Sequence, residues 1–404
     1  MRPDVALVSP YPAPGRTHDG SSGVASYTAN LARALASGGA RVLVVAPDEP
    51  TAPPSHSDGD VSVLRSGPRG PLALTQAIRL AADRRPAVIH LQQEMLLFGG
   101  LSSMATLPMA MRLLRNHEPR VITTAHQVVD PEDVTADFMT MHRIRGPVMA
   151  ARVAINAYQK TLASAGTTIV HEPGFLRQLP GSVVIPHGVE RRASPPRAQA
   201  RQRLGLAGER RLVVLCFGFV APYKGLEGAL AAAAGVPEVL MVVAGGDHPR
   251  HGARYTEALK GRWEDGARFT GWVPEEDIAD WHSAADLAVF AYPAPHSSSG
   301  AVAIALGHGT PVLTSDALAR SMGLPSAVSV SLEEVELAEC LRTYAAHRDR
   351  LAQLRQAGAG VIRGRSWPEV AERHLRLYQR VASGESDTPP LRVVSGDRGQ
   401  VEVA

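Results

Sequence analysis

The stretch Phe217-Gly218-Phe219-Val220-Ala221-Pro222-Tyr223-Lys224-Gly225 lies between the apolar run 212–215 and the helix-like segment 226–234. A glycine-containing turn between a strand and a helix is suited to hold phosphate, because its backbone N–H groups and one lysine face the same anion. The sequence therefore predicts an anion site at Lys224.

A second candidate anion site lies further along the chain. Ser297-Ser298-Ser299-Gly300 opens an apolar helix, 301–306, which is closed by Gly307-His308-Gly309-Thr310-Pro311-Val312. The first N–H groups of a helix have no partner within the helix, so they and the serine hydroxyls are available to a phosphate. The structural alternative is an ordinary N-cap serine.

Short apolar runs alternate with helical patterns along both halves of the chain. The N-terminal half shows this alternation in 5–8, 24–35, 42–46, 72–82 and 88–91, and the same rhythm restarts at Leu212. Strands that alternate with helices favour parallel sheets covered on both faces. A chain of 404 residues is long enough for two such domains. The predicted fold class is α/β, with two doubly wound, Rossmann-like domains facing a cleft.

The composition divides the chain further. We predict an N-terminal domain over 1–190, an Arg-, Pro- and Ala-rich linker over 191–210 and a C-terminal domain over 211–366. A helix over 367–382 begins with proline in its first turn. The tail 383–404, rich in Gly, Ser, Asp and Pro, is predicted to be disordered.

Several motifs of the second half occur in the order of a known family. After the strand and the Gly218–Lys224 turn come Val242-Val243-Ala244-Gly245-Gly246, then Phe269-Thr270-Gly271-Trp272-Val273-Pro274, then a small-residue helix and Gly309-Thr310-Pro311-Val312. This order resembles the donor-binding half of GT-B glycosyltransferases of retaining family 4. The resemblance implies an enzyme, a hexosyltransferase that moves a sugar from a nucleotide-sugar donor to an acceptor hydroxyl with retention and without a metal. It also implies that the helix 367–382 returns to the N-terminal, acceptor-binding domain.

The resemblance assigns roles to individual residues. Lys224 and His126, which ends the apolar run 121–125, are the expected catalytic residues: one supports the departing diphosphate and the other lies near the reacting sugar. The residues expected to bind the donor are Gly23, Gly218, Lys224, Gly245, Gly246, Trp272, Val273, His296, Ser298, Ser299, Gly300 and Ala301. The pair Gly245-Gly246 is expected to allow close approach of the donor. A polar cluster at the end of the strand 88–91 predicts acceptor-side residues, namely His90, Gln93 and Glu94.

The chain departs from the family pattern at two places. The arginine that usually precedes the lysine is replaced by Phe219 and Ala221, and the usual glutamate pair is replaced by His296 and Ile304. Either the ribose is held by backbone or by Asp316, or the donor carries a deoxyribose. The alternatives to a transferase are a catalytically weak sugar-nucleotide binding or scaffold protein and a GT-B epimerase or phosphorylase.

Other site types find little support. The two cysteines, Cys216 and Cys340, are too few for a disulfide framework or a metal site. Asp58-Gly59-Asp60 resembles a metal motif but lies in a polar segment expected to be a loop. His171-Glu172-Pro173 lacks the second histidine of a metalloprotease motif. No metal and no cofactor are expected, only a donor linked to UDP, GDP or dTDP.

The overall charge and hydrophobicity limit the partners and location. A net charge of +3 without a dense basic block disfavours nucleic acid. No apolar run approaches the roughly 18 to 20 residues of a membrane span. We expect a cytoplasmic protein with peripheral membrane contact left open. The acceptor (a lipid, a polysaccharide or a small natural product) and the oligomeric state stay undetermined.

Overall fold

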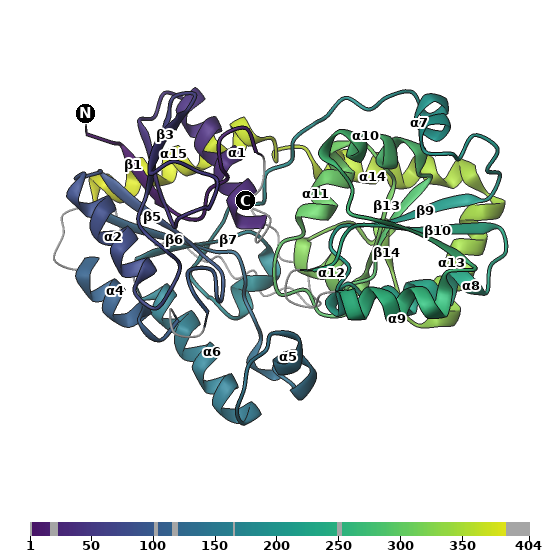
Figure 1. Ribbon diagram of the computed structural model, residues 1–404, viewed down its shortest axis with the longest axis horizontal. Coiled ribbons are helices and arrows are strands. Elements are labelled where there is room, and N and C mark those ends of the chain that lie inside the picture. Colours follow the sequence, from purple (N-terminus) through teal and green to yellow (C-terminus); the bar gives the residue numbers. More distant parts are fainter. Residues whose placement is uncertain are drawn as a thin grey trace, which may run out of the picture.

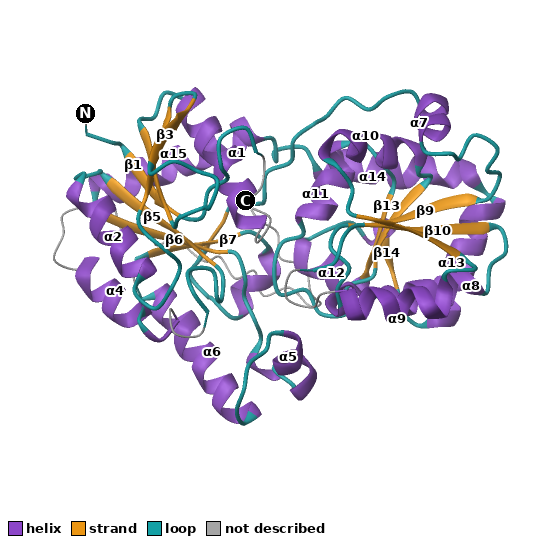
Figure 2. Ribbon diagram, in the orientation of Figure 1, coloured by secondary structure: helices purple, strands orange, loops and turns teal. Residues whose placement is uncertain are grey.

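Two sheets, one in each half of the chain, organise the computed structural model (Figure 1). The structure describes residues 2–16, 23–100, 104–114, 120–164, 166–248 and 253–384. Within these residues the first sheet has eight strands in the order β3-β4-β2-β1-β5-β6-β7-β8, and the second has six in the order β11-β10-β9-β12-β13-β14. Helices lie on both faces of each sheet (Figure 2). The predicted fold class, two doubly wound α/β domains, is confirmed.

The N-terminal sheet is parallel except for the β3–β4 hairpin. Its strands are β1 (Val5–Val8), β2 (Val42–Ala46), β3 (Ser55–Asp58), β4 (Val61–Arg65), β5 (Val88–Gln93), β6 (Arg120–Ala125), β7 (Thr167–Val170) and β8 (Val183–Val184). The helices are α1 (Gly23–Ser37), α2 (Ala73–Asp83), α4 (Leu107–Leu114), α5 (Ala136–Met141) and α6 (Val148–Ala163). Alternate β1 residues enter opposite cores: Val5 and Leu7 pack with α1, whereas Ala6 and Val8 pack with α2.

The C-terminal sheet is parallel throughout its described strands. They are β9 (Leu212–Phe217), β10 (Val239–Ala244), β11 (Ala267–Gly271), β12 (Leu287–Phe290), β13 (Val312–Ser315) and β14 (Ser329–Val330). The helices are α7 (Arg197–Arg203), α8 (Leu226–Ala234), α9 (Ala253–Trp263), α10 (Glu275–Ala284), α11 (Gly300–Gly307), α12 (Asp316–Met322), α13 (Glu334–Ala346) and α14 (Leu351–Val361). One face of β9 packs against α8 and α13, and the other against α10 and α11.

The last described helix, α15 (Trp367–Ser383), leaves the C-terminal domain and packs against α1 of the N-terminal domain (Figure 1). Its start is fixed by a capping box between Ser366 and Glu369. The two crossings between the domains lie side by side, because Val189 N donates to the Arg365 carbonyl at 2.7 Å. Of the predicted disordered tail, 383–404, residues 385–404 lie outside the described residues.

Two segments differ from the sequence-based expectation. Asp58 does not lie in a loop, since it ends β3, where its carboxylate accepts from the Tyr11 hydroxyl at 2.7 Å and pairs with Arg33 at 2.8 Å. The segment 191–210 is not a plain linker, because it contains α7, which packs against α10. No helix among the described residues is both long enough and apolar enough to cross a membrane.

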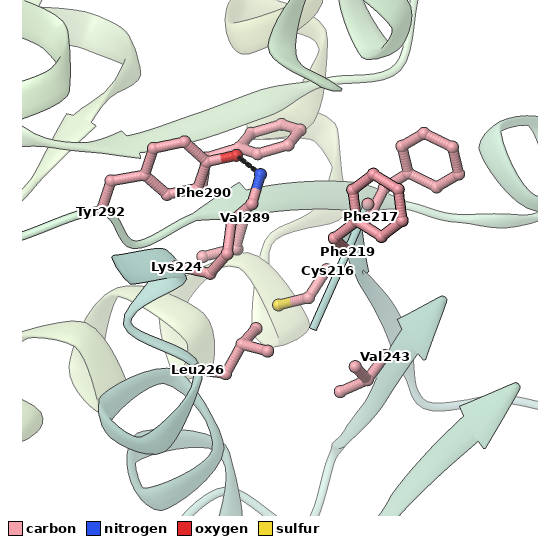
Figure 3. Close-up of a pocket in the computed structure, with 10 residues that line it drawn as sticks. Cys216, Phe217, Phe219, Lys224, Leu226, Val243, Val289, Phe290 and Tyr292 are labelled. Atoms are coloured by element: carbon pink, nitrogen blue, oxygen red, sulfur yellow. Dashed lines mark hydrogen bonds between the residues drawn. The ribbon is translucent and has the colours of Figure 1, made fainter. Parts of the chain in front are cut away.

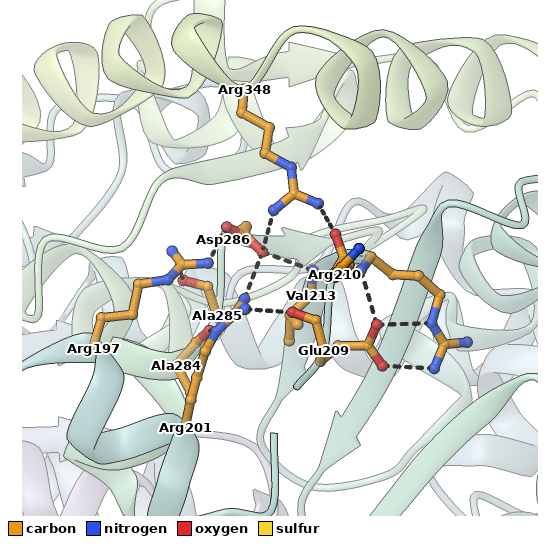
Figure 4. A network of polar contacts seen from close by, with 10 residues as sticks. Arg197, Arg201, Glu209, Arg210, Val213, Ala284, Ala285, Asp286 and Arg348 are labelled. Atoms are coloured by element: carbon orange, nitrogen blue, oxygen red, sulfur yellow. Dashed lines mark hydrogen bonds and ion pairs between the residues drawn. The ribbon is translucent and has the colours of Figure 1, made fainter. Parts of the chain in front are cut away.

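A buried carboxylate explains why α7 is fixed to the C-terminal domain (Figure 4). Asp286, whose side chain is 4% exposed, pairs with Arg197 and with Arg201, the latter at 2.9 Å. Arg348, beyond α13, lies 3.8 Å from the same carboxylate. Asp286 also accepts from the Val213 backbone N–H at 2.8 Å, which joins the network to the start of the strand β9.

We predict that Asp286→Ala lowers the free energy of unfolding by about 3–5 kcal/mol, because it leaves three arginines and a buried N–H without their shared partner. Urea unfolding at pH 7 measures this change. The control is Glu339→Gln, which removes the exposed ion pair to Arg342 and should change stability by less than about 0.5 kcal/mol. Equal effects of the two substitutions would contradict a structural role for the Asp286 network.

Candidate active site

The centre of the C-terminal sheet is a topological switch point. The chain passes from β9 to β10 on one side, while β12, on the other side of β9, belongs to the returning half of the sheet. Loops that leave the carboxyl ends of such neighbouring strands diverge and open a crevice, where doubly wound domains bind ligands. Lys224 follows β9 and Ser299 follows β12, so both predicted anion-binding segments meet at this point.

Lys224 ends the 3-10 turn Pro222–Lys224 and is only 9% exposed. Figure 3 shows its amine reaching the Tyr292 hydroxyl, to which it donates a hydrogen bond. The amine also lies 4.4 Å from the centroid of the Tyr292 ring and 5.2 Å from that of Tyr223. Burial lowers the pKa of Lys224. Among the described residues, its positive charge is therefore stabilised by phenol groups and not by a carboxylate.

The space beside the Lys224 amine is small, with a cavity of about 10 Å³, close to the volume that one water needs (Figure 3). Its lining combines this amine with apolar side chains, among them Phe217, Val243 and Phe290. Cys216 also lines it, and burial raises the pKa of this thiol to about 12, so the thiol is not a nucleophile at neutral pH.

The N-terminus of α11 faces the same amine. Ser299 caps the helix by accepting from Val302 N at 3.3 Å, and its hydroxyl lies 3.1 Å from that of Tyr292. A Cβ atom on Gly218, which has φ +107°, would lie 3.5 Å from Ala301 Cβ and 3.6 Å from Lys224 Nζ. The turn after β9, the lysine and the first turn of α11 thus converge on one small volume.

The glycine pair after β10 has a different explanation from the one the sequence suggested. A Cβ on Gly245 would lie 1.9 Å from the Gly218 carbonyl oxygen, and one on Gly246 would lie 3.1 Å from the Trp272 ring. Close approach of the Gly218 backbone therefore already requires glycine at 245, whereas a side chain at 246 would press only on the exposed Trp272 side chain. Trp272 itself is 54% exposed, whereas Val273 is buried.

The N-terminal wall of the site contains a buried chain of histidines. His126 Nε2 lies 2.7 Å from Gln92 Oε1, and its Nδ1 lies 3.2 Å from His171 Nε2. The Gln92 amide also contacts His90 at 3.3 Å, and His90 Nδ1 lies 2.7 Å from the hydroxyl of Tyr378 on α15. Hydrogen bonds therefore connect α15 to His126.

The hydrogen bond at the His171 end of this histidine series determines which ring nitrogens carry protons. His171 Nδ1 donates to the Ile185 carbonyl at 2.9 Å, so neutral His171 accepts at Nε2 from His126 Nδ1. Neutral His126 then accepts a hydrogen bond at Nε2, so the NH₂ group of the Gln92 amide must face it. If the amide oxygen of Gln92 faces Nε2 instead, both ring nitrogens of His126 carry a proton and the ring is charged. Burial lowers the pKa of both histidines, which favours the neutral arrangement.

The predicted acceptor-side residues are not equally accessible. His90 is fully buried between Tyr378 and Thr124, so its predicted contact with an acceptor is wrong: its ring lies on the side of the sheet that α15 covers. Gln93 is 3% exposed and its Oε1 lies 3.4 Å from the Tyr158 hydroxyl. Glu94 follows β5 and is half-buried, and Gly23 is the exposed first residue of α1. For these last three residues the acceptor or donor role stays a prediction.

The loop before α11 joins the two walls. The His296 carbonyl accepts from Val128 N at 2.8 Å, and its ring lies 5.4 Å from that of Phe138, both across the domain boundary. Ser298 donates to Glu172, which follows β7. Ile304, at the position of the second family glutamate, is half-buried on α11.

Two residues of this site, Tyr292 and Glu172, were not predicted from the sequence. Tyr292 follows the apolar run of β12 by two residues, so a phenol at a strand end was the available signal. Glu172 was considered only as part of a metalloprotease motif. Among the described residues, His, Cys, Asp and Glu side chains form no group of three or more suited to a metal ion.

The buried histidines predict that stability falls in mild acid. Burial lowers the pKa of His171 to about 3 and those of His187 and His374 to about 4. Between pH 6.5 and about 4 the unfolded chain binds more protons at these sites, so the free energy of unfolding should decrease by about 1.4 kcal/mol per pH unit for each of them. Glu172, whose pKa burial raises to about 7, opposes this trend with a single proton.

Urea unfolding at pH 7.5, 6.5, 5.5 and 4.5 measures the slope. His374→Asn should reduce the slope by the contribution of one proton. A free energy of unfolding that stays flat from pH 6.5 to 4.5 would contradict neutral histidines in the folded state.

Comparison with known proteins agrees with this architecture. Residues 22–186 match the model of the glycosyl transferase 4-like domain, and residues 211–343 match that of the glycosyl transferases group 1. A comparison with curated proteins gave no match.

Solved structures share the fold at low sequence identity. A sucrose-phosphate synthase from Thermosynechococcus elongatus has a TM-score of 0.77 at 22% identity, covering 95% of this chain and 100% of that one. Anabaena HepE in complex with UDP has a TM-score of 0.66 at 15% identity, with 94% and 100% covered. The catalytic domain of Arabidopsis thaliana starch synthase IV, bound to ADP and acarbose, has a TM-score of 0.67 at 14% identity, covering 95% of this chain and 100% of that one. Because the two family models follow one another along most of the chain, one in each domain, the protein belongs to the GT-B glycosyltransferases of the family 4 and group 1 type.

Proposed function

We propose that the protein transfers a hexose from a nucleotide-sugar donor to an acceptor hydroxyl, with retention of the anomeric configuration and without a metal ion. The observation that carries the proposal is the buried amine of Lys224, which lies at the switch point of the C-terminal sheet beside the N-terminus of α11. A buried cation with phenol neighbours is poised for an anionic ligand.

In the proposed reaction the donor diphosphate lies against Lys224 and the first N–H groups of α11. Negative charge grows on the leaving oxygen as the bond to the anomeric carbon breaks, and fixed positive groups lower the energy of that state. Because the amine is buried, it acts in a medium of low polarity, where its attraction to the diphosphate is stronger than in water. Tyr292 keeps the amine in place through its hydroxyl.

Structural neighbours support a nucleotide sugar as donor. One HepE structure contains UDP and glucose and another contains UDP-glucose, while the starch synthase structure contains ADP. The base of the donor of this protein is not assigned by these likenesses, and UDP, GDP and dTDP remain the candidates. Trp272, half-exposed beside Gly246, is the proposed neighbour of the base.

On the opposite wall we propose that His126 lies near the reacting sugar. Its ring is held on both sides, by Gln92 and by His171, so its orientation is fixed before substrate arrives. Gln93, the last residue of β5, and Glu94, which follows it, are proposed to line the acceptor side. Gly23, at the start of α1, is proposed to contact the donor.

Lys224→Ala should lower kcat/KM by roughly 30- to 1,000-fold, because about 2–4 kcal/mol of transition-state stabilisation is lost. It should also weaken binding of the nucleoside diphosphate, measured by isothermal titration calorimetry. Lys160→Ala, on the exposed surface of α6, is the matched control and should leave both quantities unchanged. Unaltered kinetics of the Lys224 variant would sink the phosphate assignment.

The metal and stereochemical parts of the proposal have their own test. Transfer should continue in excess EDTA, since Lys224 and the α11 amides supply the charge that a divalent ion would supply. Proton NMR of the first product should show the same anomeric configuration as the donor. Loss of activity in EDTA with rescue by magnesium would overturn metal independence. A product of inverted anomeric configuration would overturn retention. Product formation in the absence of any acceptor would favour an epimerase.

A further inference from the structure

Glu172 is a fully buried acid between the two domains. It follows β7, precedes the 3-10 turn Pro173–Arg177 and is 0% exposed. One carboxyl oxygen, Oε1, accepts a hydrogen bond from the hydroxyl of Ser298 in the other domain. The second oxygen, Oε2, is buried and has no hydrogen-bond partner among the described residues.

An unpaired buried carboxyl oxygen is costly, and native proteins rarely keep one without a reason. Burial raises the pKa of Glu172 to about 7, although Arg365 and the Ser298 hydroxyl favour its charged form. A purely structural bond between the domains would account for Oε1. It leaves Oε2 unexplained, so this oxygen points to a partner that binds from outside the protein.

The neighbours of Glu172 limit what that partner is. Ser298 directly precedes Ser299, whose hydroxyl lies 3.1 Å from that of Tyr292, the phenol that receives the Lys224 hydrogen bond. On the other side, His171 precedes Glu172 in the chain and contacts His126 at 3.2 Å. Glu172 therefore lies between the proposed diphosphate site and the proposed sugar-side histidine. The part of a nucleotide sugar that joins these two places is the sugar ring, whose free groups are hydroxyls.

We propose that Glu172 is a sugar-binding residue, whose Oε2 accepts a hydrogen bond from a hydroxyl of the transferred hexose. This inference rests on the proposed function and deepens it: the N-terminal domain supplies a carboxylate to the donor sugar, and Ser298 positions that carboxylate from the C-terminal domain. The contact forms only when a nucleotide sugar, and not a nucleoside diphosphate alone, occupies the site.

The test compares two ligands in each variant by isothermal titration calorimetry. UDP, GDP, dTDP and ADP, each with and without an attached hexose, are first titrated into the wild-type protein to choose the pair that binds. Glu172→Gln should then weaken binding of the nucleotide sugar by about 10- to 100-fold, as expected for loss of a hydrogen bond to a charged group. Binding of the matching diphosphate should change by less than about twofold. Glu190→Gln, an exposed glutamate that pairs with Arg192, is the control and should change neither.

The outcomes separate this inference from the proposed function. Failure of the wild-type protein to bind any of the diphosphates or nucleotide sugars would overturn the proposed function. A second outcome would overturn only the sugar contact. If the wild-type protein binds the diphosphate, but Glu172→Gln and Ser298→Ala each weaken binding of the diphosphate and of the nucleotide sugar by the same factor, Glu172 only joins the domains.

A second measurement does not depend on folding of the Glu172 variant. Monodeoxy forms of the chosen nucleotide hexose, titrated into the wild-type protein, should include one whose affinity falls by about the same factor, because a site built to bind a hydroxyl disfavours the analogue that lacks it. In Glu172→Gln that analogue should lose little further affinity. If every deoxy analogue binds the wild-type protein as tightly as the parent compound, Glu172 makes no such contact.

Discussion

The site depends on one electrostatic constraint, the burial of the Lys224 charge without a carboxylate partner among the described residues. Removing an ammonium group from water is costly, and the Tyr292 hydroxyl and two aromatic rings offset part of this cost around Lys224. The arrangement keeps the charge available for an anion. A carboxylate in the same place would stabilise the empty protein and compete with the proposed diphosphate.

Close backbone contacts position Lys224 and its neighbour Tyr292. Gly218, at positive φ, brings its carbonyl against Gly245, and the same turn carries the chain toward Lys224. Gly225, with φ +64°, leaves space for the Ala291 carbonyl, which lies next to Tyr292. A side chain at Gly225 or Gly245 would separate backbone segments that contact each other. Packing therefore fixes the distance between the lysine and its phenol partner.

The alternation of apolar runs and helices was sufficient to predict the doubly wound domains. The lysine in a strand-to-helix turn led to a phosphate site that stays a prediction. Local patterns did not reveal pairings between residues far apart in the chain. His90 lies in the run 88–91 near the end of a predicted strand, which suggested a cleft residue, yet α15 returns to cover it through Tyr378, 288 positions later. Glu172 likewise becomes a candidate site residue only through its hydrogen bond with Ser298 of the other domain. Such contacts depend on how two folded units meet, which sequence periodicity does not encode.

The paired crossings at Val189 and Arg365 have a mechanical consequence. Two connections bonded to each other act as a single hinge, so the domains are able to rotate about one line more easily than they slide. The helix α15 begins directly after this hinge and carries Tyr378, which contacts His90 and, through it, the Gln92 amide beside His126. Because α15 packs on the N-terminal domain, rotation about this hinge would carry Tyr378 and His126 together, and the hydrogen bonds that orient His126 would stay the same while the C-terminal domain moves.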